Sequence, residues 1–317
     1  MKKIVLMLLI YIMITGCQEQ SYPTIKNDES FVASLNVRDS SLSFISDGAQ
    51  SMATWNLNEL YTGGILLNNN QDLLLFGYQL NHVSLFSLQR GELLEKWTIG
   101  EGITGAIEIG DEIALASSKT NEVIIVSKRG EITKRINVGL YPMDMKIYNG
   151  DLYVINYKDT SLSVIELTSK TVVREFEVPS SSTGLFIDEN VIWVGGHGQG
   201  SKPRTDLRFY SSQNGAELGS VEVGTMPVNV VKDKEGYFVA SHGSNEIYQL
   251  DRNKKVVNSR IIGANPFTLV TFSEWVVVAG YDSNELYFLN KDTLEPERTV
   301  GVEKGPFVLL SREKVME

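Results

Sequence analysis

A pattern that recurs about every forty residues constrains the fold of this chain more than any other feature. The chain carries six similar apolar segments, centred near residues 74, 114, 153, 193, 238 and 277: DLLLFGY, EIALASS, DLYVINY, VIWVGGH, GYFVASH and WVVVAGY. One short apolar segment precedes each of them and two follow, so every repeat predicts four strands rich in Val, Ile, Leu, Phe and Tyr. Tandem four-stranded units of this length are typical of β-propellers, whose units bury their faces against their neighbours.

The number of units follows from what the complete repeats leave over. Six units span Tyr61 to Gly305, with the segments FVASLNV, SLSFISD and SMATWNL before them and PFVLLSR, Pro306–Arg312, after them. Three strands from one end and one from the other complete a seventh blade, which would close the ring and remove its open edges. The sequence therefore predicts an all-β, seven-bladed propeller of antiparallel blades, as a single domain over residues 31–317.

The N-terminal residues MKKIVLMLLIYIMITGCQEQ have the composition of an export signal. The apolar run Ile4–Thr15 is about half as long as the ~20 residues that a membrane span needs, and it follows two lysines. The segment ITGC resembles a bacterial lipoprotein lipobox, which implies a signal peptide over residues 1–16 and lipid attachment to Cys17. An ordinary signal peptide or an uncleaved anchor helix is the alternative. Polar residues 17–30 predict a tether, and we expect the protein to be lipid-anchored on the extracytoplasmic face of a bacterial membrane.

Charge and missing motifs exclude several functions. The chain has a formal charge of −10, and loss of the two lysines in residues 1–16 gives −12, so we expect no nucleic-acid partner. Cys17 is the only cysteine, which leaves nothing for disulfides. GGHGQG lacks the Lys-Ser/Thr of a phosphate-binding loop, and neither a nucleophile elbow nor a haem-attachment motif is present. We expect no cofactor, no metal site and a monomeric propeller.

One repeated position is rich in aromatic residues. Directly after the second strand, the repeats place Val37, Tyr78, Ser118, Tyr157, His197, His242 and Tyr281. Tyr and His combine an apolar face with a polar tip, which suits a concave site for a ligand or partner at one rim of the central channel. The alternative is that these side chains only cap strand ends and cover the junctions between blades.

The stretch VGGHGQGSKPRTD, Val194–Asp206, lengthens one loop of this rim. About five extra residues around Gln199–Arg204 make it the longest loop of the repeat, and Lys202 and Arg204 bring positive charge to an acidic chain. We therefore predict the binding rim from these two basic residues and the repeated position: Tyr78, Ser118, Tyr157, His197, Lys202, Arg204, His242 and Tyr281.

Other repeated residues have structural interpretations. Asn121, Asn245 and Asn284 lie where tight turns are expected, since Asn adopts left-handed backbone conformations readily. Proline opens the first strand of four units, where a strand loses no hydrogen bond by its presence. Polar groups expected to face the channel after these prolines include Asp144, Asn229 and Thr268, so an ion held on the axis is one alternative.

The third complete repeat resembles the YVTN family of β-propeller proteins. Its sequence is VGLYPMDMKIYNGDLYVINYKDTSLSVIELTSKTVVREFEV, Val138–Val178, and the segments VGTMPVNVV and IGANPFTLV repeat the first part. The resemblance implies a propeller over nearly all of the mature chain. For function it implies only a range, because the family contains binding proteins, surface proteins and some enzyme subunits.

Three functions fit these observations. The first is a membrane-tethered binding module whose Tyr/His rim holds an envelope protein or a small ligand. The second is a propeller lyase or hydrolase in which His197 or His242 is the general base and Lys202 or Arg204 stabilises the developing negative charge. The third is a structural component of a cell-envelope assembly that makes contact through the sides of its blades. The missing catalytic motifs favour the first.

Overall fold

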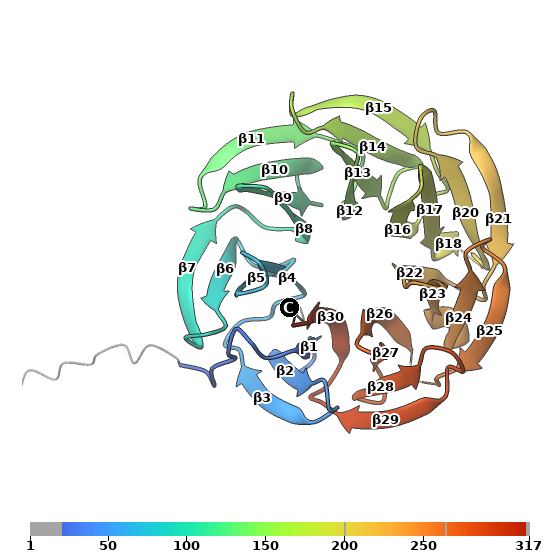
Figure 1. Cartoon of the computed structure of the whole chain (residues 1–317). Coiled ribbons are helices and arrows are strands. Elements are labelled where there is room, and N and C mark those ends of the chain that lie inside the picture. The colour runs from blue at the N-terminus through green and yellow to red at the C-terminus, as the bar shows by residue number, and fades with distance from the viewer. Residues whose placement is uncertain (1–20, 200, 264, 315–317) are drawn as a thin grey trace, which may run out of the picture.

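Seven four-stranded antiparallel sheets form a ring in the computed structural model, which describes residues 21–199, 201–263 and 265–314 (Figure 1). The all-β, seven-bladed prediction is confirmed. We number the blades 1–7 in chain order. In blades 2–7 the strand nearest the centre comes first in the chain and the outermost strand last, whereas in blade 1 the innermost strand is β30 from the end of the sequence, as the colours of Figure 1 show.

The strands of the first four blades have these bounds. Blade 1 contains β30 (Pro306–Arg312), β1 (Phe31–Asn36), β2 (Ser41–Ser46) and β3 (Ser51–Asn56). Blade 2 contains β4 (Gly63–Leu67), β5 (Asp72–Phe76), β6 (His82–Ser87) and β7 (Glu92–Thr98). Blade 3 contains β8 (Ile103–Ile109), β9 (Glu112–Ser117), β10 (Glu122–Ser127) and β11 (Ile132–Asn137). Blade 4 contains β12 (Pro142–Tyr148), β13 (Asp151–Asn156), β14 (Ser161–Glu166) and β15 (Thr171–Glu177).

The remaining blades follow the same order. Blade 5 contains β16 (Ser182–Asp188), β17 (Val191–Gly196), β20 (Asp206–Ser211) and β21 (Glu217–Glu222), with a small extra hairpin of β18 (Gly198–Gln199) and β19 (Lys202–Pro203). Blade 6 contains β22 (Pro227–Lys232), β23 (Gly236–Ser241), β24 (Glu246–Asp251) and β25 (Val256–Ile261), and a 3-10 turn, η1 (His242–Ser244), follows β23. Blade 7 contains β26 (Pro266–Phe272), β27 (Trp275–Gly280), β28 (Glu285–Asn290) and β29 (Pro296–Gly301).

The composite blade closes the ring as the repeat count predicts. β30 pairs antiparallel with β1, so that Val32 lies opposite Ser311 and Ala33 opposite Leu310. The last strand of the chain thereby becomes the innermost strand of the first blade. Because this pairing closes the ring, no blade lies at the end of an open stack with an unpaired strand edge.

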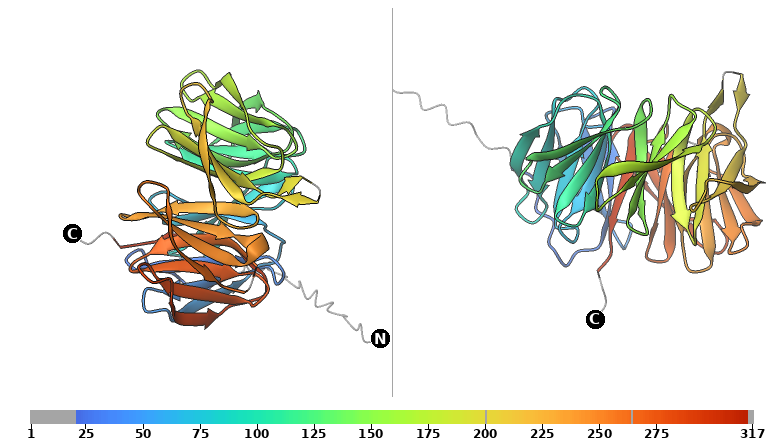
Figure 2. Two further views of the ribbon diagram at one scale, coloured as in Figure 1. Left: turned by 90° about the vertical axis from the view of Figure 1, so that its right-hand side faces the viewer. Right: turned by 90° about the horizontal axis from the view of Figure 1, so that it is seen from above.

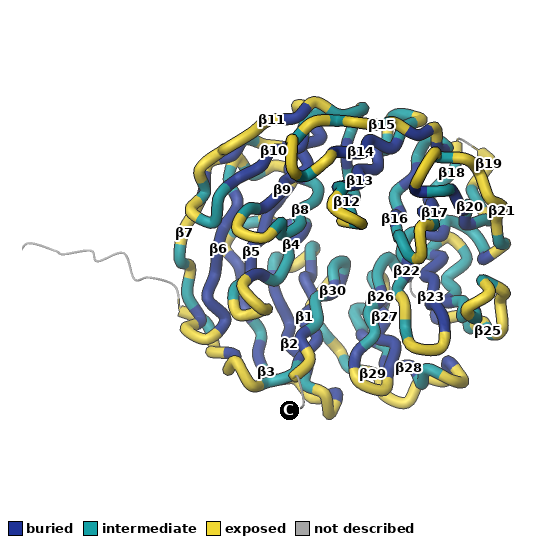
Figure 3. The backbone as a smooth tube through the Cα atoms, turned by 45° about the horizontal axis from the view of Figure 1, so that its top comes forward, coloured by how far each residue is buried: buried dark blue, intermediate teal, exposed yellow. Residues whose placement is uncertain are grey.

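The hydrophobic core is divided among the junctions between blades. Over the part of the chain that the structure describes, buried side chains form seven clusters, and each contains residues of two adjacent blades. The middle strands are buried on both faces, which explains their continuous apolar sequences, whereas the outer strands alternate or are exposed (Figure 3). The 40-residue repeat thus encodes one strand set that packs against a copy of itself.

Polar side chains also join neighbouring inner strands. Asp144 Oδ2 accepts a hydrogen bond from the Leu185 amide at 3.3 Å, and Asn229 Oδ1 accepts one from the Leu269 amide at 3.1 Å. These bonds cross from blade 4 to blade 5 and from blade 6 to blade 7. Two of the three residues considered for an axial ion therefore use side-chain oxygens to hold the ring together.

Residues 21–30, here called the strap, pack against blades 1 and 2. The Tyr22 ring stacks on the Trp55 ring with 4.7 Å between centroids, and Ile25 is buried in the same cluster. The Tyr22 amide donates to the Gly91 carbonyl at 2.6 Å, and Gly91 has φ +64°; a Cβ there would lie 2.1 Å from the Tyr22 oxygen.

The tether predicted over residues 17–30 overlaps the strap, and the part of it that the structure describes packs against the ring. The strap is polar in overall composition, but its two apolar side chains, Tyr22 and Ile25, pack against the ring and hold the segment there. Cys17 and the rest of residues 1–20 lie outside the described residues. Within the described residues, no helix is long and apolar enough to cross a membrane.

Arg312 fastens the strap to the end of β30. Its side chain donates hydrogen bonds to the carbonyl oxygens of Glu29 and Asn70, both at 3.0 Å, and to that of Lys26. The guanidinium also lies 4.6 Å from the centre of the Phe31 ring. The Arg312 side chain therefore connects the last strand, the strap and blade 2. The residue is only 5% exposed, so these bonds are shielded from solvent.

Candidate functional site

Aromatic side chains form a continuous arc on one face of the ring. Neighbouring ring centroids are 4.4–6.3 Å apart, within the range of favourable aromatic contact. In order around the ring, the members of this aromatic arc are Tyr78, Tyr141, Tyr157, His197, His242, Phe267, Tyr281 and Phe307. The arc runs from blade 2 through blades 3–7 to β30 of blade 1.

The structure brings together five of the predicted rim residues in this arc: Tyr78, Tyr157, His197, His242 and Tyr281. Ser118 occupies the equivalent position in blade 3 but has no aromatic ring. Its hydroxyl donates to the Gly102 carbonyl at 2.9 Å. Val37 begins the turn after β1, and its amide donates to the Gly305 carbonyl at 2.9 Å, which joins this turn to the loop before β30. Whether the arc binds anything stays a prediction.

Three members of the arc were not predicted from the sequence. Tyr141, Phe267 and Phe307 stand beside the prolines that open inner strands, Pro142, Pro266 and Pro306. Their rings fill the intervals between members from the predicted position: Tyr141 lies between Tyr78 and Tyr157. The repeated Pro-Phe pairs, PF at 266 and 306, were the available signal.

The repeated asparagines hold the loops that carry these rings. Asn121, Asn245 and Asn284 all have φ between +56° and +60°, as the turn interpretation requires. Their side-chain oxygens accept hydrogen bonds, each at 3.0 Å, from the amides of Tyr141, Asn265 and Gly305 respectively. Each bond joins a turn inside one blade to the loop that leads into the next, so the same residue type sets the spacing of the arc at three junctions.

Two cations lie over rings of the arc. The Arg38 guanidinium is 4.3 Å from the centre of the Tyr281 ring and bonds to Asp282 at 3.1 Å, while the Lys158 ammonium is 4.3 Å from the centre of the Tyr141 ring. Burial raises the pKa of the Tyr141 hydroxyl, so it stays protonated and can donate at neutral pH. The arc is thus aromatic, partly apolar and edged with positive charge.

The two histidines form the closest contact between titratable groups in the arc. Their ring centroids are 4.9 Å apart, and His242 Nδ1 lies 3.1 Å from Asn265 Oδ1. Burial lowers the pKa of both rings, and for His197 the neighbouring His242 lowers it further. Both imidazoles are therefore neutral at pH 7. His197 Nδ1 and His242 Nε2 are buried without a hydrogen-bond partner within the protein.

Metal ligation is not evident around these rings. Within residues 21–199, 201–263 and 265–314, no group of three or more His, Cys, Asp and Glu side chains is arranged to hold a metal ion. The neutral imidazoles can instead accept or donate single hydrogen bonds, which is the chemistry of ligand recognition or of a general base.

The insertion near His197 forms a hairpin beside the arc. β18 pairs with β19, and the hairpin projects from one face of the ring, here called the upper face (Figure 2). The side-chain amide of Gln199 donates through Nε2 to the Ser180 hydroxyl in the loop after blade 4, which connects the hairpin across the junction. Lys202 is exposed, whereas the Arg204 side chain is only 7% exposed. The Arg204 side chain is therefore largely covered by the protein, whereas Lys202 lies open to solvent.

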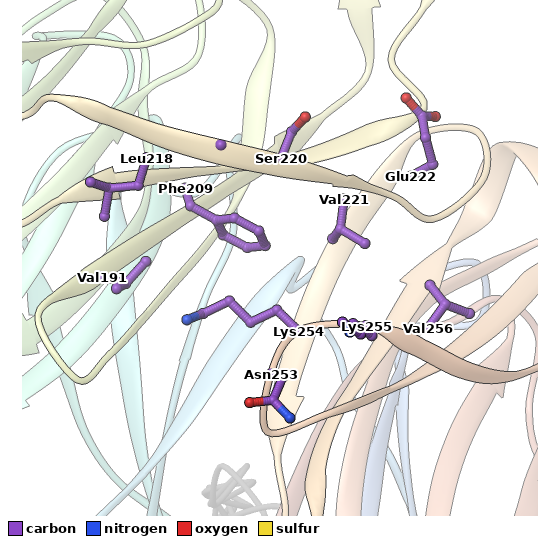
Figure 4. A pocket seen from close by; sticks show the side chains of 11 residues that line it. Val191, Phe209, Leu218, Ser220, Val221, Glu222, Asn253, Lys254, Lys255 and Val256 are labelled. Carbon is purple, nitrogen blue, oxygen red and sulfur yellow. The ribbon is translucent and has the colours of Figure 1, made fainter.

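A pocket lies on the outer wall of the ring, between blades 5 and 6 (Figure 4). Its volume is about 630 Å³, and Phe209, Leu218 and Val221 line it together with Lys254. The Lys254 ammonium lies 5.7 Å from the centre of the Phe209 ring and 5.8 Å from that of Trp193. This crevice opens where outer strands of neighbouring blades diverge, away from the aromatic arc.

Comparison with known proteins supports the fold and leaves the function open. No protein-family model and no curated protein matches the sequence. A functionally unknown protein from Desulfotomaculum acetoxidans superposes with a TM-score of 0.73 at 10% identity, over 89% of this chain and 98% of that chain.

Two structures with given names are similar to it as well. The dihydro-heme d1 dehydrogenase NirN gives a TM-score of 0.69 at 11% identity, over 92% of this chain and 77% of that chain. Apo AztD from Citrobacter koseri gives 0.62 at 12% identity, over 90% and 97%. At such identities the similarity shows a common propeller fold alone. Membership of the YVTN family stays a prediction.

Proposed function

We propose that this protein is an exported, membrane-tethered binding module whose aromatic arc captures a small ligand or a partner protein. The observation that carries the proposal is the unbroken succession of eight partly exposed or exposed rings on one face. Soluble domains rarely leave contiguous apolar side chains uncovered unless they bind something. Rigid aromatic rings contribute large contact areas at a small cost in conformational entropy.

Simultaneous replacement of Tyr157, His197 and Tyr281 by Ala tests this proposal. The three residues come from different blades, so the variant removes rings along most of the arc. We expect crosslinking of a partner in intact cells, or retention of a small ligand on purification, to be lost while the circular dichroism spectrum stays unchanged. Unchanged capture by a folded triple variant would contradict the proposal. A matched variant with Leu218, Val256 and Val257 replaced by Ala on the outer wall should retain capture, because these exposed residues lie away from the arc.

The same crosslinking separates the alternatives. A structural role in an envelope assembly predicts that the outer-wall variant loses its adducts and the arc variant keeps them. A lyase predicts turnover of a substrate that His197→Ala or His242→Ala abolishes alone. The neutral, buried state of both imidazoles gives this enzymatic alternative its physical support, since a general base must be unprotonated.

The membrane tether is a separate part of the proposal. It depends on the lipobox-like segment before Cys17 and predicts a processed, lipid-modified protein in the membrane fraction. Cys17→Ala should prevent lipid attachment, so that metabolic labelling with a fatty acid is lost. A Cys17→Ala protein that is still labelled would contradict the lipid anchor without affecting the aromatic arc.

A further inference from the structure

A pocket of about 450 Å³ adjoins the aromatic arc on the upper face. It lies between loops of blade 4 and the β18–β19 hairpin of blade 5. Among its lining residues are three basic side chains and a single acidic one: Lys202, Arg204, Arg208 and Asp206. In a chain with a formal charge of −10, this surplus of positive charge is unusual.

Arg204 is the least satisfied charged group of the pocket. Its side chain is 93% buried, and neither Nε nor Nη1 has a hydrogen-bond acceptor within the protein. The nearest carboxylate oxygen, of Asp206, is 3.9 Å from Nη1, and that carboxylate already bonds to Arg208 Nε at 3.1 Å. A buried cation without acceptors is costly, so its persistence calls for an explanation. Burial accordingly lowers the pKa of Arg204.

Most of the buried polar atoms without a partner belong to one blade. Among the described residues, eight buried side-chain nitrogen or oxygen atoms have no partner within the protein, and five of them belong to blade 5. They include Thr183 Oγ1, His197 Nδ1 and the two Arg204 nitrogens. Each of these four atoms can donate a hydrogen bond. The two Arg204 nitrogens belong to a residue that lines the pocket and make it complementary to a negatively charged acceptor.

The pocket is continuous with the arc through two loops. The Arg204 amide donates to the His197 carbonyl at 3.1 Å, so the main-chain segments that carry a pocket residue and a member of the arc lie side by side. Tyr157 of the arc and Thr160 of the pocket stand at the two ends of one turn between β13 and β14. A ligand that covers Tyr157 and His197 therefore has the pocket beside it.

We infer that this pocket is an anion subsite of the arc, which takes the carboxylate of a ligand whose flat aromatic body lies across Tyr157 and His197. A carboxylate matches the planar guanidinium in a bidentate pair, and its single charge suits a pocket in which Asp206 would repel a dianion. The inference depends on the proposed function and specifies the ligand class of the same site.

Calorimetric titration of the purified full-length protein tests the inference with matched probes. 1-Naphthoate carries the expected charge, and 1-naphthamide has the same body without it. We expect the acid to bind at least about tenfold more tightly than the amide, since a charge-assisted pair contributes that much or more. Arg204→Met should reduce this ratio to about one while the affinity for the amide stays unchanged.

Lys254→Met is the matched control, because it also replaces a basic side chain beside aromatic rings but lies on the outer wall. It should keep the acid-to-amide ratio. A peptide with a C-terminal tryptophan carboxylate, titrated beside its amide, shows whether a chain end or a free acid supplies the group; discrimination by Arg204 in either pair supports the subsite.

The outcomes separate the subsite from the proposed function. Equal binding of acid and amide to the wild type, weakened in both cases by Tyr157→Ala, would overturn the subsite and leave the arc as a binding surface. Persistence of the ratio in Arg204→Met would also overturn it. If no probe binds, the subsite is wrong, while capture by the arc is still decided by the crosslinking of the triple variant.

Discussion

Two buried arginines occupy opposite faces of this propeller and differ in what surrounds them. Arg312, on the lower face, donates to three main-chain carbonyls and lies against the Phe31 ring. Arg204, on the upper face, leaves two of its nitrogens without acceptors. Burial lowers the pKa of both guanidinium groups, so desolvation alone does not distinguish them. Their partners do: a saturated cation holds the fold, whereas an unsaturated one is available to a ligand.

The largest effect on stability should come from removal of residues 306–317, which include Arg312. The deletion takes away β30 together with Arg312, so blade 1 loses its inner strand and the ring opens. We expect loss of the cooperative thermal transition and rapid digestion by a protease. Deletion of residues 315–317 alone is the control and should leave melting unchanged. A cooperative transition in the longer deletion would contradict the requirement for closure.

Arg312→Met isolates the saturated arginine. Three carbonyls lose their charged donor, so the free energy of unfolding should fall by about 3 kcal/mol, within the range for broken buried ionic networks. Urea denaturation measures the change, provided that unfolding is two-state. Arg312→Lys should recover only part of it, since an ammonium cannot reach three carbonyls from the same geometry. A loss below about 0.5 kcal/mol would show that the strap is held by Tyr22 and Ile25 alone.

Arg204→Met tests whether the arginine without acceptors contributes to stability. The substitution removes a buried charge with few partners, and Asp206 keeps Arg208, so the free energy of unfolding should stay constant or rise by about 1 kcal/mol. The same urea series measures it. Destabilisation as large as that of Arg312→Met would mean that Arg204 supports the fold and would remove the reason for an anion subsite.

The smallest expected effect is on the pH dependence of stability, and it comes from His197 and His242 of the aromatic arc. Because both folded-state pKa values lie below the ordinary value of about 6.5, the unfolded chain binds more protons as the pH falls through that value. Stability should therefore decrease from pH 7 towards pH 5, and Tm should fall with it. His197→Gln combined with His242→Gln should flatten this slope. An equal slope in the double variant would assign the pH dependence to other groups.

The sequence was sufficient for the architecture because each repeat encodes the same strands. Apolar segments at a fixed period determine how many blades exist, and an incomplete repeat at each end implies closure between β1 and β30. Five of the eight rings of the aromatic arc follow from the same comparison of equivalent positions. Tyr141, Phe267 and Phe307 escaped it, because the direction of a ring at the start of an inner strand depends on the register of that strand.

The environment of Arg204 could not be read from the sequence. An arginine in a glycine-rich insertion is ordinarily exposed, and only the folding of the hairpin towards the Ser180 loop buries it. The strap was missed for a related reason. Its polar composition concealed Tyr22 and Ile25, two side chains that find partners only after blades 1 and 2 have met.

The pairing of β1 with β30 also orders events in time. A ribosome makes Val32 long before Ser311, its partner across the closing ladder. Until β30 emerges, the first blade has no inner strand, and contacts of such long sequence separation form slowly. Blade 1 therefore stays incomplete on a nascent chain until β30 has been made. A chain cut short before Pro306 would lack the strand that closes the ring.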